Sequence, residues 1–291
     1  MRRTPVASRL LAGVDQRALK LKYAEALGVP LTQRLLSIGI VVVGMALAGY
    51  ALWRFGFSLD KLVDGAGRLG TVVFLMMPPD PGNQFWNYMT ALGETLAIAF
   101  LGTFAAAVLA LPIGALAAKN VIANRIVHFA SRRFLDSIRG VDTLIWALIW
   151  INVVGLGPFA GILAILTSDF GTFGKLFSEA IEAADRKPVE GVVSVGGSGV
   201  HGFRFGVLPQ VMPVLVSQVL YYFESNTRSA TIIGIVGAGG IGLYLANEIG
   251  QAEWQRVAFL ILMILATVAA IDWVSSKVRF AVIGGRGRNF G

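Results

Sequence analysis

Cysteine is absent from this 291-residue chain, and histidine occurs only at His128 and His201. Without thiolates and with two isolated imidazoles, the chain offers neither a disulfide framework nor the clustered ligands of a metal site. No G-x-x-x-x-G-K-[ST] phosphate-binding loop occurs, so the chain has no such ATP site of its own. We therefore predict no catalytic residue, no metal and no directly bound cofactor.

Charge is also scarce: 14% of the residues are charged, against about 25% in soluble domains. Hydrophobic residues make up 55%, the mean hydropathy is +0.69, and the apolar residues form blocks long enough to cross a bilayer as helices of ~20 residues. The sequence predicts an all-α, polytopic membrane protein. The net charge of +8 lies mostly in the loops of one side, which indicates membrane topology rather than a nucleic-acid partner.

Basic residues set the predicted topology. We assign 1–34 as a cytoplasmic N-terminal region, 35–275 as the transmembrane domain and 276–291 as a cytoplasmic basic tail. The loop 119–139 is predicted to lie on the cytoplasmic side as well. The segment 58–87, in which Pro78 is expected to break any helix, is placed outside. Six spans are expected, at about 35–57, 91–118, 137–156, 159–177, 207–223 and 257–274.

The segment 229–250 is apolar enough to suggest another span, but a seventh crossing would export the basic tail. It is rich in glycine, so we predict a short re-entrant or packed element. Its stretch Gly237-Ala238-Gly239-Gly240-Ile241-Gly242 also fits the G-x-G-x-x-G dinucleotide pattern. The apolar flanks exclude that interpretation, because the pattern requires a soluble strand-turn-helix unit.

Small residues recur every fourth position in the second span, at Gly102, Ala106, Ala110 and Gly114. Such a stripe lets two helices approach closely. We expect packing within one subunit, with a dimer seam as the alternative.

Two groups of polar residues lie in or beside the spans. Asp169 in the fourth span is either a functional carboxylate or a residue next to a glycine-broken, hydrated stretch. Glu224, Asn226 and Arg228 are expected at the outer end of the fifth span. Glu224 and Arg228 can pair as a structural anchor, or Arg228 can face a translocation pathway and attract an anion.

A polar loop at 178–206 separates the fourth and fifth spans. It contains Glu190-Gly191, then Gly196-Gly197, and Leu208-Pro209 begins the next apolar helix. Glycine permits a turn and proline favours a helix start, so this spacing predicts a knob projecting from the membrane domain. Glu190 is otherwise an ordinary solvated acid at a helix start.

This spacing resembles the loop of the permeases of binding-protein-dependent ABC importers, Glu-Ala-Ala, three residues, Gly, nine residues, Ile-x-Leu-Pro. Glu190, Gly196 and Leu208-Pro209 fall in register, whereas Gly191, Val192 and Gly206 replace the alanines and the isoleucine. The downstream stretch from Leu208 to Gly242 resembles the phosphonate-type permeases. The resemblance covers about residues 90–275 in general pattern.

The resemblance implies a type I importer fold in the inner membrane and alternating access. It implies two copies of the chain, two cytoplasmic ABC ATPase subunits that bind ATP and Mg, and an extracytoplasmic substrate-binding protein, with lipid around the spans. Glu190, Gly191, Gly196, Gly197 and Pro209 would belong to the ATPase-docking loop. Phosphonate is the implied substrate, and phosphate, phosphite or another small solute remain alternatives.

Two other classes of protein compete with this resemblance. A secondary transporter driven by an ion gradient would be supported by inverted repeats and charge relays inside the membrane. No convincing repeat is found, and Asp169 is the one charge well inside a predicted span. A membrane-embedded enzyme would need clustered His, Glu or Asp, which the sequence does not offer.

Overall fold

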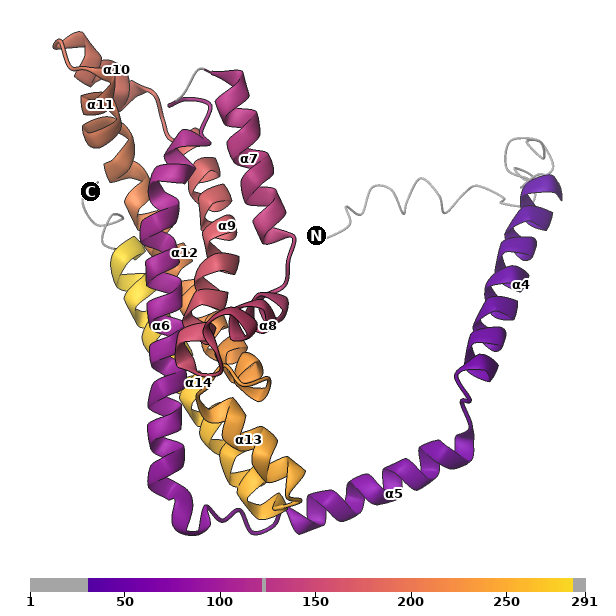
Figure 1. The fold of residues 1–291 in the computed structure, drawn as a ribbon. Coiled ribbons are helices and arrows are strands. Elements are labelled where there is room, and N and C mark those ends of the chain that lie inside the picture. Colours follow the sequence, from indigo (N-terminus) through magenta and orange to yellow (C-terminus); the bar gives the residue numbers. More distant parts are fainter. Residues whose placement is uncertain (1–30, 122–123, 285–291) are drawn as a thin grey trace, which may run out of the picture. The chain divides into compact units, whose positions relative to one another are not determined.

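The computed structural model describes residues 31–121 and 124–284, and this part of the chain contains helices and no β-strand, as predicted (Figure 1). Most of the predicted cytoplasmic region 1–34 and the end of the tail 276–291 lie outside the described residues. The helices are α4 (Leu31–Arg54), α5 (Leu59–Leu75), η1 (Gly82–Gln84), α6 (Phe85–Leu116), α7 (Arg125–Arg139), α8 (Thr143–Val154), α9 (Pro158–Glu182), α10 (Lys187–Ser194), α11 (Gly199–His201), η2 (Gly202–Val207), α12 (Leu208–Ile235), α13 (Ile241–Gly250) and α14 (Trp254–Gly284).

The chain divides into two compact units, residues 1–70 and 71–291. In the first unit α4 is an apolar helix, and α5 begins where the Ser58 hydroxyl accepts a hydrogen bond from the Lys61 amide at 3.1 Å. The expectation that 58–87 has no helix is therefore wrong. The prolines that were expected to break a helix lie beyond the end of α5.

The second unit is a helix bundle in which α6 packs along α9 and α12 (Figure 1). α10 and α11 lie at one end of this bundle and α13 extends towards the other. The core between α6, α9 and α12 is apolar and contains buried aromatic and aliphatic side chains. Phe173 and Phe177 stack within it at a ring-centroid distance of 5.3 Å.

The predicted third span, 137–156, is not one straight helix. It is replaced by α7 and α8, whose axes differ by 84°. Asn124 caps α7 by accepting from the Ile126 amide at 2.9 Å, and Asp142 caps α8 by accepting from the Leu144 amide at 2.8 Å. Because each helix has its own N-cap, the chain turns between them, and much of the predicted loop 119–139 is helical.

The fifth span is longer than predicted, since α12 continues through the polar triplet to Ile235. Glu224, Asn226 and Arg228 thus lie inside the helix rather than at its outer end. The predicted packed element 229–250 is also divided, because its first residues complete α12. A turn and the short helix α13 form the remainder. Within this continuation the Thr227 hydroxyl donates to the Phe223 carbonyl one turn earlier, at 3.0 Å.

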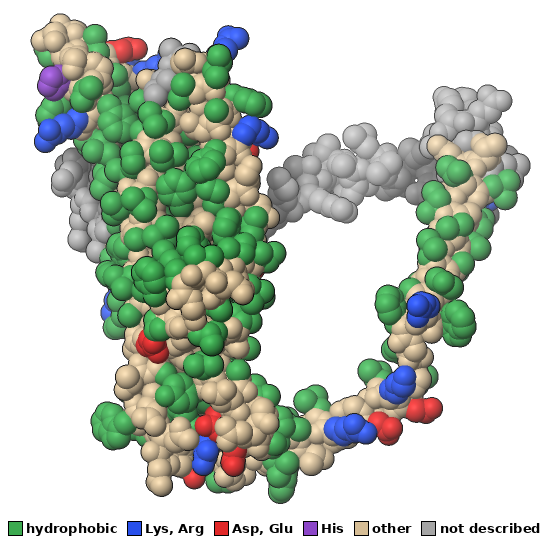
Figure 2. Space-filling view, viewed as in Figure 1, with side chains coloured by type: hydrophobic (Ala, Val, Ile, Leu, Met, Phe, Trp, Pro, Cys, Tyr) green, Lys and Arg blue, Asp and Glu red, His purple; other side chains and the backbone are tan. Residues whose placement is uncertain are grey.

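Among the described residues, five helices are long and apolar enough to cross a membrane, or six if the bent pair α7–α8 is one span. Hydrophobic side chains cover the middle of the bundle in Figure 2, and most charged side chains lie nearer its ends. The predicted membrane architecture of about six helices with a short glycine-rich packed segment is confirmed.

Candidate functional site

The projecting loop between α9 and α12 has little contact with the core. Helix α10, which contains Glu190 and Gly191, buries none of its residues, and Pro188 lies in its first turn. Gly196 follows α10 with φ of +89°, a conformation that side chains rarely adopt. Beside it, a Cβ on Gly197 would lie 2.6 Å from the Val192 carbonyl oxygen. The two glycines therefore fold the chain back tightly on α10.

The base of this loop is closed by Gln210, in the first turn of α12 next to Pro209. Its side-chain oxygen accepts from the Asp185 amide and its Nε2 donates to the Asp185 carbonyl, both at 3.1 Å. The π-helical segment η2 packs against α10, where a Cβ on Gly206 would lie 2.9 Å from the Val189 Cα. The segments that enter and leave the loop are thus held together where they meet the bundle.

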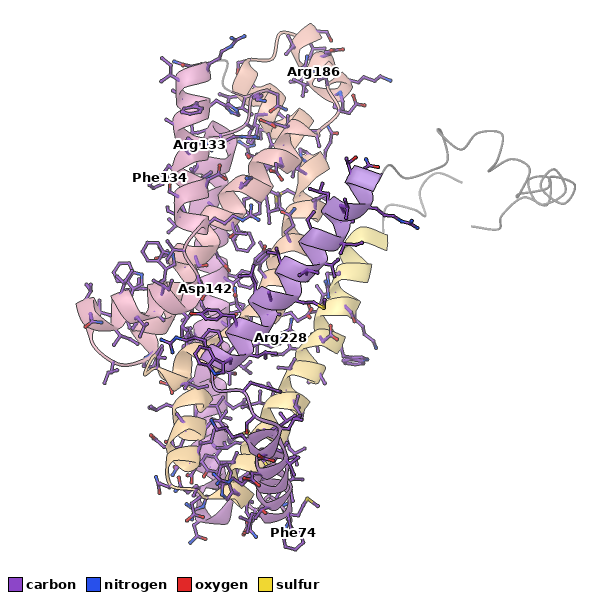
Figure 3. All side chains as sticks on the ribbon, turned by 90° about the vertical axis from the view of Figure 1, so that its right-hand side faces the viewer. Phe74, Arg133, Phe134, Asp142, Arg186 and Arg228 are labelled. Atoms are coloured by element: carbon purple, nitrogen blue, oxygen red, sulfur yellow. The ribbon has the colours of Figure 1, made fainter. Side chains whose placement is uncertain are left out.

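A groove of about 820 Å³ opens between this loop and the end of α6. Lys119, Arg186 and Glu190 line it together with apolar side chains such as Phe203. Figure 3 places Arg186 at this end of the bundle. The arrangement presents charge of both signs around an apolar floor, which suits a protruding segment of another protein.

Ionic contacts tie the helices together behind the groove. Glu182 at the end of α9 accepts from Arg132 of α7 at 2.9 Å and from the Lys119 amide at 2.8 Å. Asp136 of α7 pairs with Lys175 of α9 at 2.8 Å. Sequence reasoning did not select these residues. Their signal was the presence of oppositely charged residues in 119–139 and in the second half of α9.

A buried polar cluster lies in the middle of the bundle. The Asn226 amide of α12 donates to the Thr103 hydroxyl of α6 at 2.8 Å and to the Asp169 carboxylate of α9. Asp169 is only 4% exposed. The structure therefore brings two of the predicted pathway residues, Asp169 and Asn226, into direct contact inside the helix packing. Thr103 was missed, because a lone hydroxyl on an apolar helix gives no sequence signal.

Glu224 has a closer partner than the predicted one. Arg279 of α14 donates to its Oε2 at 3.0 Å, whereas Arg228 approaches Oε1 only to 3.7 Å, beyond hydrogen-bond distance. Glu224 is 8% exposed, while half of the Arg228 side chain is exposed. The expected Glu224–Arg228 pair exists, but it is the weaker of two. Arg279 was missed because it lies in the predicted basic tail.

The glycine-rich turn between α12 and α13 is packed on all sides. Gly237, Gly239 and Gly240 have φ of +103°, +81° and +74°. A Cβ on Gly239 would lie 2.9 Å from the Pro158 nitrogen, and a Cβ on Gly242 would collide with the Thr231 carbonyl oxygen. Only glycine combines these conformations with such close backbone approach.

The turn delivers the N-terminus of α13 to α6. The Glu94 carboxylate accepts from the Gly240 amide at 3.1 Å, and the Thr95 hydroxyl accepts from the Ile241 amide at 2.8 Å. An acid at a helix N-terminus interacts favourably with the helix dipole. Glu94 therefore serves as a cap in this structure.

The stripe of small residues in α6 faces α9. Gly102, Ala106, Ala110 and Gly114 are all buried. A Cβ on Gly102 would lie 2.7 Å from the Ile165 Cβ, and one on Gly114 would lie 2.9 Å from the Phe177 Cβ. Both neighbours belong to the same chain. The stripe is thus occupied by α9 of the same chain, as expected, rather than left free on the surface.

At the far end of the bundle, α13 is anchored by another buried acid, Glu248. Tyr88 of α6 donates to Glu248 Oε1 at 2.8 Å, and Arg256 of α14 lies 3.4 Å from Glu248 Oε2. Among residues 31–121 and 124–284, no group of three His, Cys, Asp or Glu side chains is placed to hold a metal ion.

Comparison with known proteins supports, over most of the chain, the family resemblance found in the sequence. Residues 110–280 match the family model of the binding-protein-dependent transport system inner membrane component. The phosphite transport system permease protein PtxC of Stutzerimonas stutzeri is 34% identical over 244 residues, which are 83% of this chain and 88% of that protein.

Two further similarities cover parts of the bundle. PhnE2 of Escherichia coli (strain K12), named for a cryptic phosphonate transport system, is 45% identical over 117 residues, 40% of this chain and 96% of that protein. The fold is similar to the MetNI methionine ABC transporter in an inward-facing conformation, with a TM-score of 0.61, 20% identity, and coverage of 68% of this chain and 97% of that chain. The chain therefore belongs to the family of binding-protein-dependent transport system inner membrane components, which are multi-pass transport subunits.

Proposed function

We propose that two copies of this chain form the translocation pathway of an ATP-driven importer for a small phosphorus oxyanion. Phosphonate is the first choice, because the stretch 208–242 resembles phosphonate-type permeases; phosphite and phosphate are the alternatives. The observation that carries the proposal is α10, an exposed helix on a loop that is closed at its base by Gln210. It provides a rigid projection through which a partner can move the spans.

Two cytoplasmic ABC ATPase subunits would bind this projection, and they would hold the ATP and Mg. Glu190 would pair with a basic group of the ATPase, and Gly196 and Gly197 would shape the turn that presents α10. Pro209, in the first turn of α12, would fix where the helix leaves the loop. The substrate-binding protein would deliver its ligand at the opposite end of the bundle, where α13 lies. Both termini would be cytoplasmic.

The ion-gradient mechanism is less well supported by the bundle. A proton or cation relay needs a series of acids at membrane depth. Asp169 instead contacts the Asn226 amide, and Glu224 is hydrogen-bonded by Arg279. We infer that Asp169 and Asn226 join α9 to α12, the two helices that lead into and out of the projecting loop.

The test is uptake by proteoliposomes that contain the chain and its ATPase, with the loaded binding protein outside. Uptake is expected only with ATP and with both partners present. Transport driven by an ion gradient without ATP would overturn the proposal. Calorimetry of the cognate binding protein with phosphonate, phosphite and phosphate then identifies the substrate, and preference for a ligand without phosphorus would refute the oxyanion assignment.

A further inference from the structure

One stripe of α12 remains exposed in the single chain. This stripe begins at Tyr221 and reaches Arg228 two helical turns later. Ile232 and Ile235 follow at intervals of about one turn, so all four residues share one face. Ser225 lies between the first two. The Arg228 side chain is 49% exposed. Gln218 and Ser225 are polar residues on the same face, and the buried side-chain oxygen of Gln218 has no hydrogen-bond partner among the described residues. This face is unusually polar for a membrane helix.

Arg228 lies at membrane depth rather than at a boundary. Asn226, on the same turn, reaches Thr103 near the middle of α6, and both belong to candidate spans. Figure 3 shows Arg228 midway between the ends of the bundle. A guanidinium facing lipid there would cost at least about 2.5–3.5 kcal/mol. The stripe therefore requires a polar environment, which water and a second copy of the chain can supply.

The charges around Arg228 do not cancel. Glu224 is hydrogen-bonded by Arg279 at 3.0 Å, and Arg228 is 3.7 Å away. Two guanidinium groups thus share one carboxylate, which leaves one positive charge. Since Arg279 neutralises the acid from the α14 side, Glu224 does not repel an anion that approaches Arg228 from the exposed side.

We propose that Arg228 of two copies of this chain forms a binding site for the phosphorus oxyanion on the pathway, with the exposed stripe of α12 facing the partner copy. The inference rests on the proposed function. In a two-fold dimer, a residue near the axis faces its own counterpart. Two guanidinium groups there repel each other in a low-dielectric site, and an oxyanion between them relieves the repulsion. Its several oxygens match the planar donor fork of arginine.

Glu224 and Arg279 are positioning residues in this site. The carboxylate draws the Arg228 side chain back along α12, and Arg279 limits the strength of that attraction. A cation held loosely in this way can bind an anion and release it again. This ability to release is what a transport site requires.

The first test uses Arg228→Gln in the full complex with its ATPase and binding protein. Uptake of the oxyanion is expected to fall about tenfold or more, because a charge-assisted hydrogen bond is lost on each side. ATP hydrolysis stimulated by the binding protein, and the amount of assembled complex, should remain close to wild type. Arg228→Lys should be intermediate, since it retains the charge and loses the fork.

Lys277→Gln is the matched control, because it removes the same charge from an exposed position on α14. It should transport normally. Normal uptake by Arg228→Gln would overturn the site, and so would a loss of uptake that only follows a loss of complex. Failure of the wild type to require ATP and the binding protein would instead refute the proposed function.

A double substitution separates the site from a purely structural ion pair. Glu224→Gln/Arg279→Gln removes the acid together with its neutralising partner and leaves Arg228 in place. Under the proposal both variants lose uptake, and the double variant loses less than Arg279→Gln alone, because in the single variant Glu224 captures Arg228. A double variant that is as defective as Arg228→Gln at normal abundance would contradict the proposal.

The last test asks whether the stripe faces water, and it uses the absence of native cysteine. Ile232→Cys, at a side chain that is 55% exposed beside Arg228, should react rapidly with a water-soluble thiol reagent in the assembled complex. Leu265→Cys, at a 58% exposed apolar position of α14, should react slowly because it faces lipid. Equal or slower labelling of Ile232→Cys would overturn the inference.

Discussion

The projecting loop and the glycine-rich turn between α12 and α13 use glycine differently. We call the end with α10 the docking end and the end with α13 the outer end, after the proposed function. In the loop, added Cβ atoms on Gly191, Gly196 and Gly199 would meet nothing within 4 Å among the described residues, although one on Gly197 would lie 2.6 Å from the Val192 carbonyl oxygen. In the turn, Cβ atoms on Gly239 and Gly242 would both collide with neighbouring backbone. The turn is therefore closely packed, whereas most of the loop has free space around it.

The strongest way to break this contrast is to fill the outer turn. Gly242→Leu would force a side chain against the Thr231 carbonyl, and overpacking of this kind typically costs about 1–3 kcal/mol or more. The amount of folded protein in the membrane, measured by detergent extraction and size-exclusion chromatography, should fall sharply. Gly93→Leu is the control, because Gly93 lies exposed on α6 with free space around it among the described residues. Equal losses in both variants would show that the turn is not closely packed.

A smaller effect on abundance, but a large one on coupling, is expected at the docking end. Gly196→Asp places a side chain at φ +89°, which strains the backbone by about 1–2 kcal/mol without a clash. The protein should remain in the membrane, while uptake falls and ATP hydrolysis continues. The assay is the ratio of substrate transported to ATP hydrolysed. Gly191→Asp, in the helical part of the loop, should uncouple less; normal coupling in Gly196→Asp would mean that the docking loop is misplaced.

Opening the base of the loop should have a more modest effect. Gln210→Ala removes hydrogen bonds to Asp185 and Gly206, each worth about 0.5–1.5 kcal/mol. The expected result is a partial loss of coupling, with thermal stability reduced slightly. Gln251→Ala, the same truncation at an exposed position of the outer end, should change neither property. If both variants behave alike, the hydrogen bonds of Gln210 have no role in coupling ATP hydrolysis to uptake.

Single cysteines sharpen the comparison with no expected effect on transport. A cysteine at Ser198 in the docking loop should be protected from an impermeant reagent in intact cells. One at Glu253, between α13 and α14, should be labelled, because we propose that these ends face opposite sides of the membrane. Cysteines at Ser8, Ser131 and Asn289 should be protected like Ser198. Labelling of Asn289 beside protection of Ser8 would place the termini on opposite sides.

Composition and periodicity were sufficient to predict the membrane class and most helices, because hydrophobic length is a local property. They failed where contacts between distant segments decide. The length of α12 was underestimated since its polar triplet looks like a helix end, yet Thr103 and Asp169 satisfy Asn226 inside the bundle. Likewise, Asp142 was not recognised as a cap that starts α8.

The candidate site divides in the same way. Glu190, Gly196 and Pro209 form one continuous segment, so their spacing could be read from the sequence. The partner of Glu224 could not, since Arg279 is remote in the chain and reaches it only because α14 returns beside α12.

The pair of hydrogen bonds between Gln210 and Asp185 has a mechanical consequence. By joining Asp185, just after α9, to the first turn of α12, it makes the ends of those two helices move together. The same two helices are linked again inside the bundle by the hydrogen bond between Asn226 and Asp169. Two links at different depths resist sliding of one helix along the other. A force that a partner applies to α10 would therefore tilt α9 and α12 as a pair.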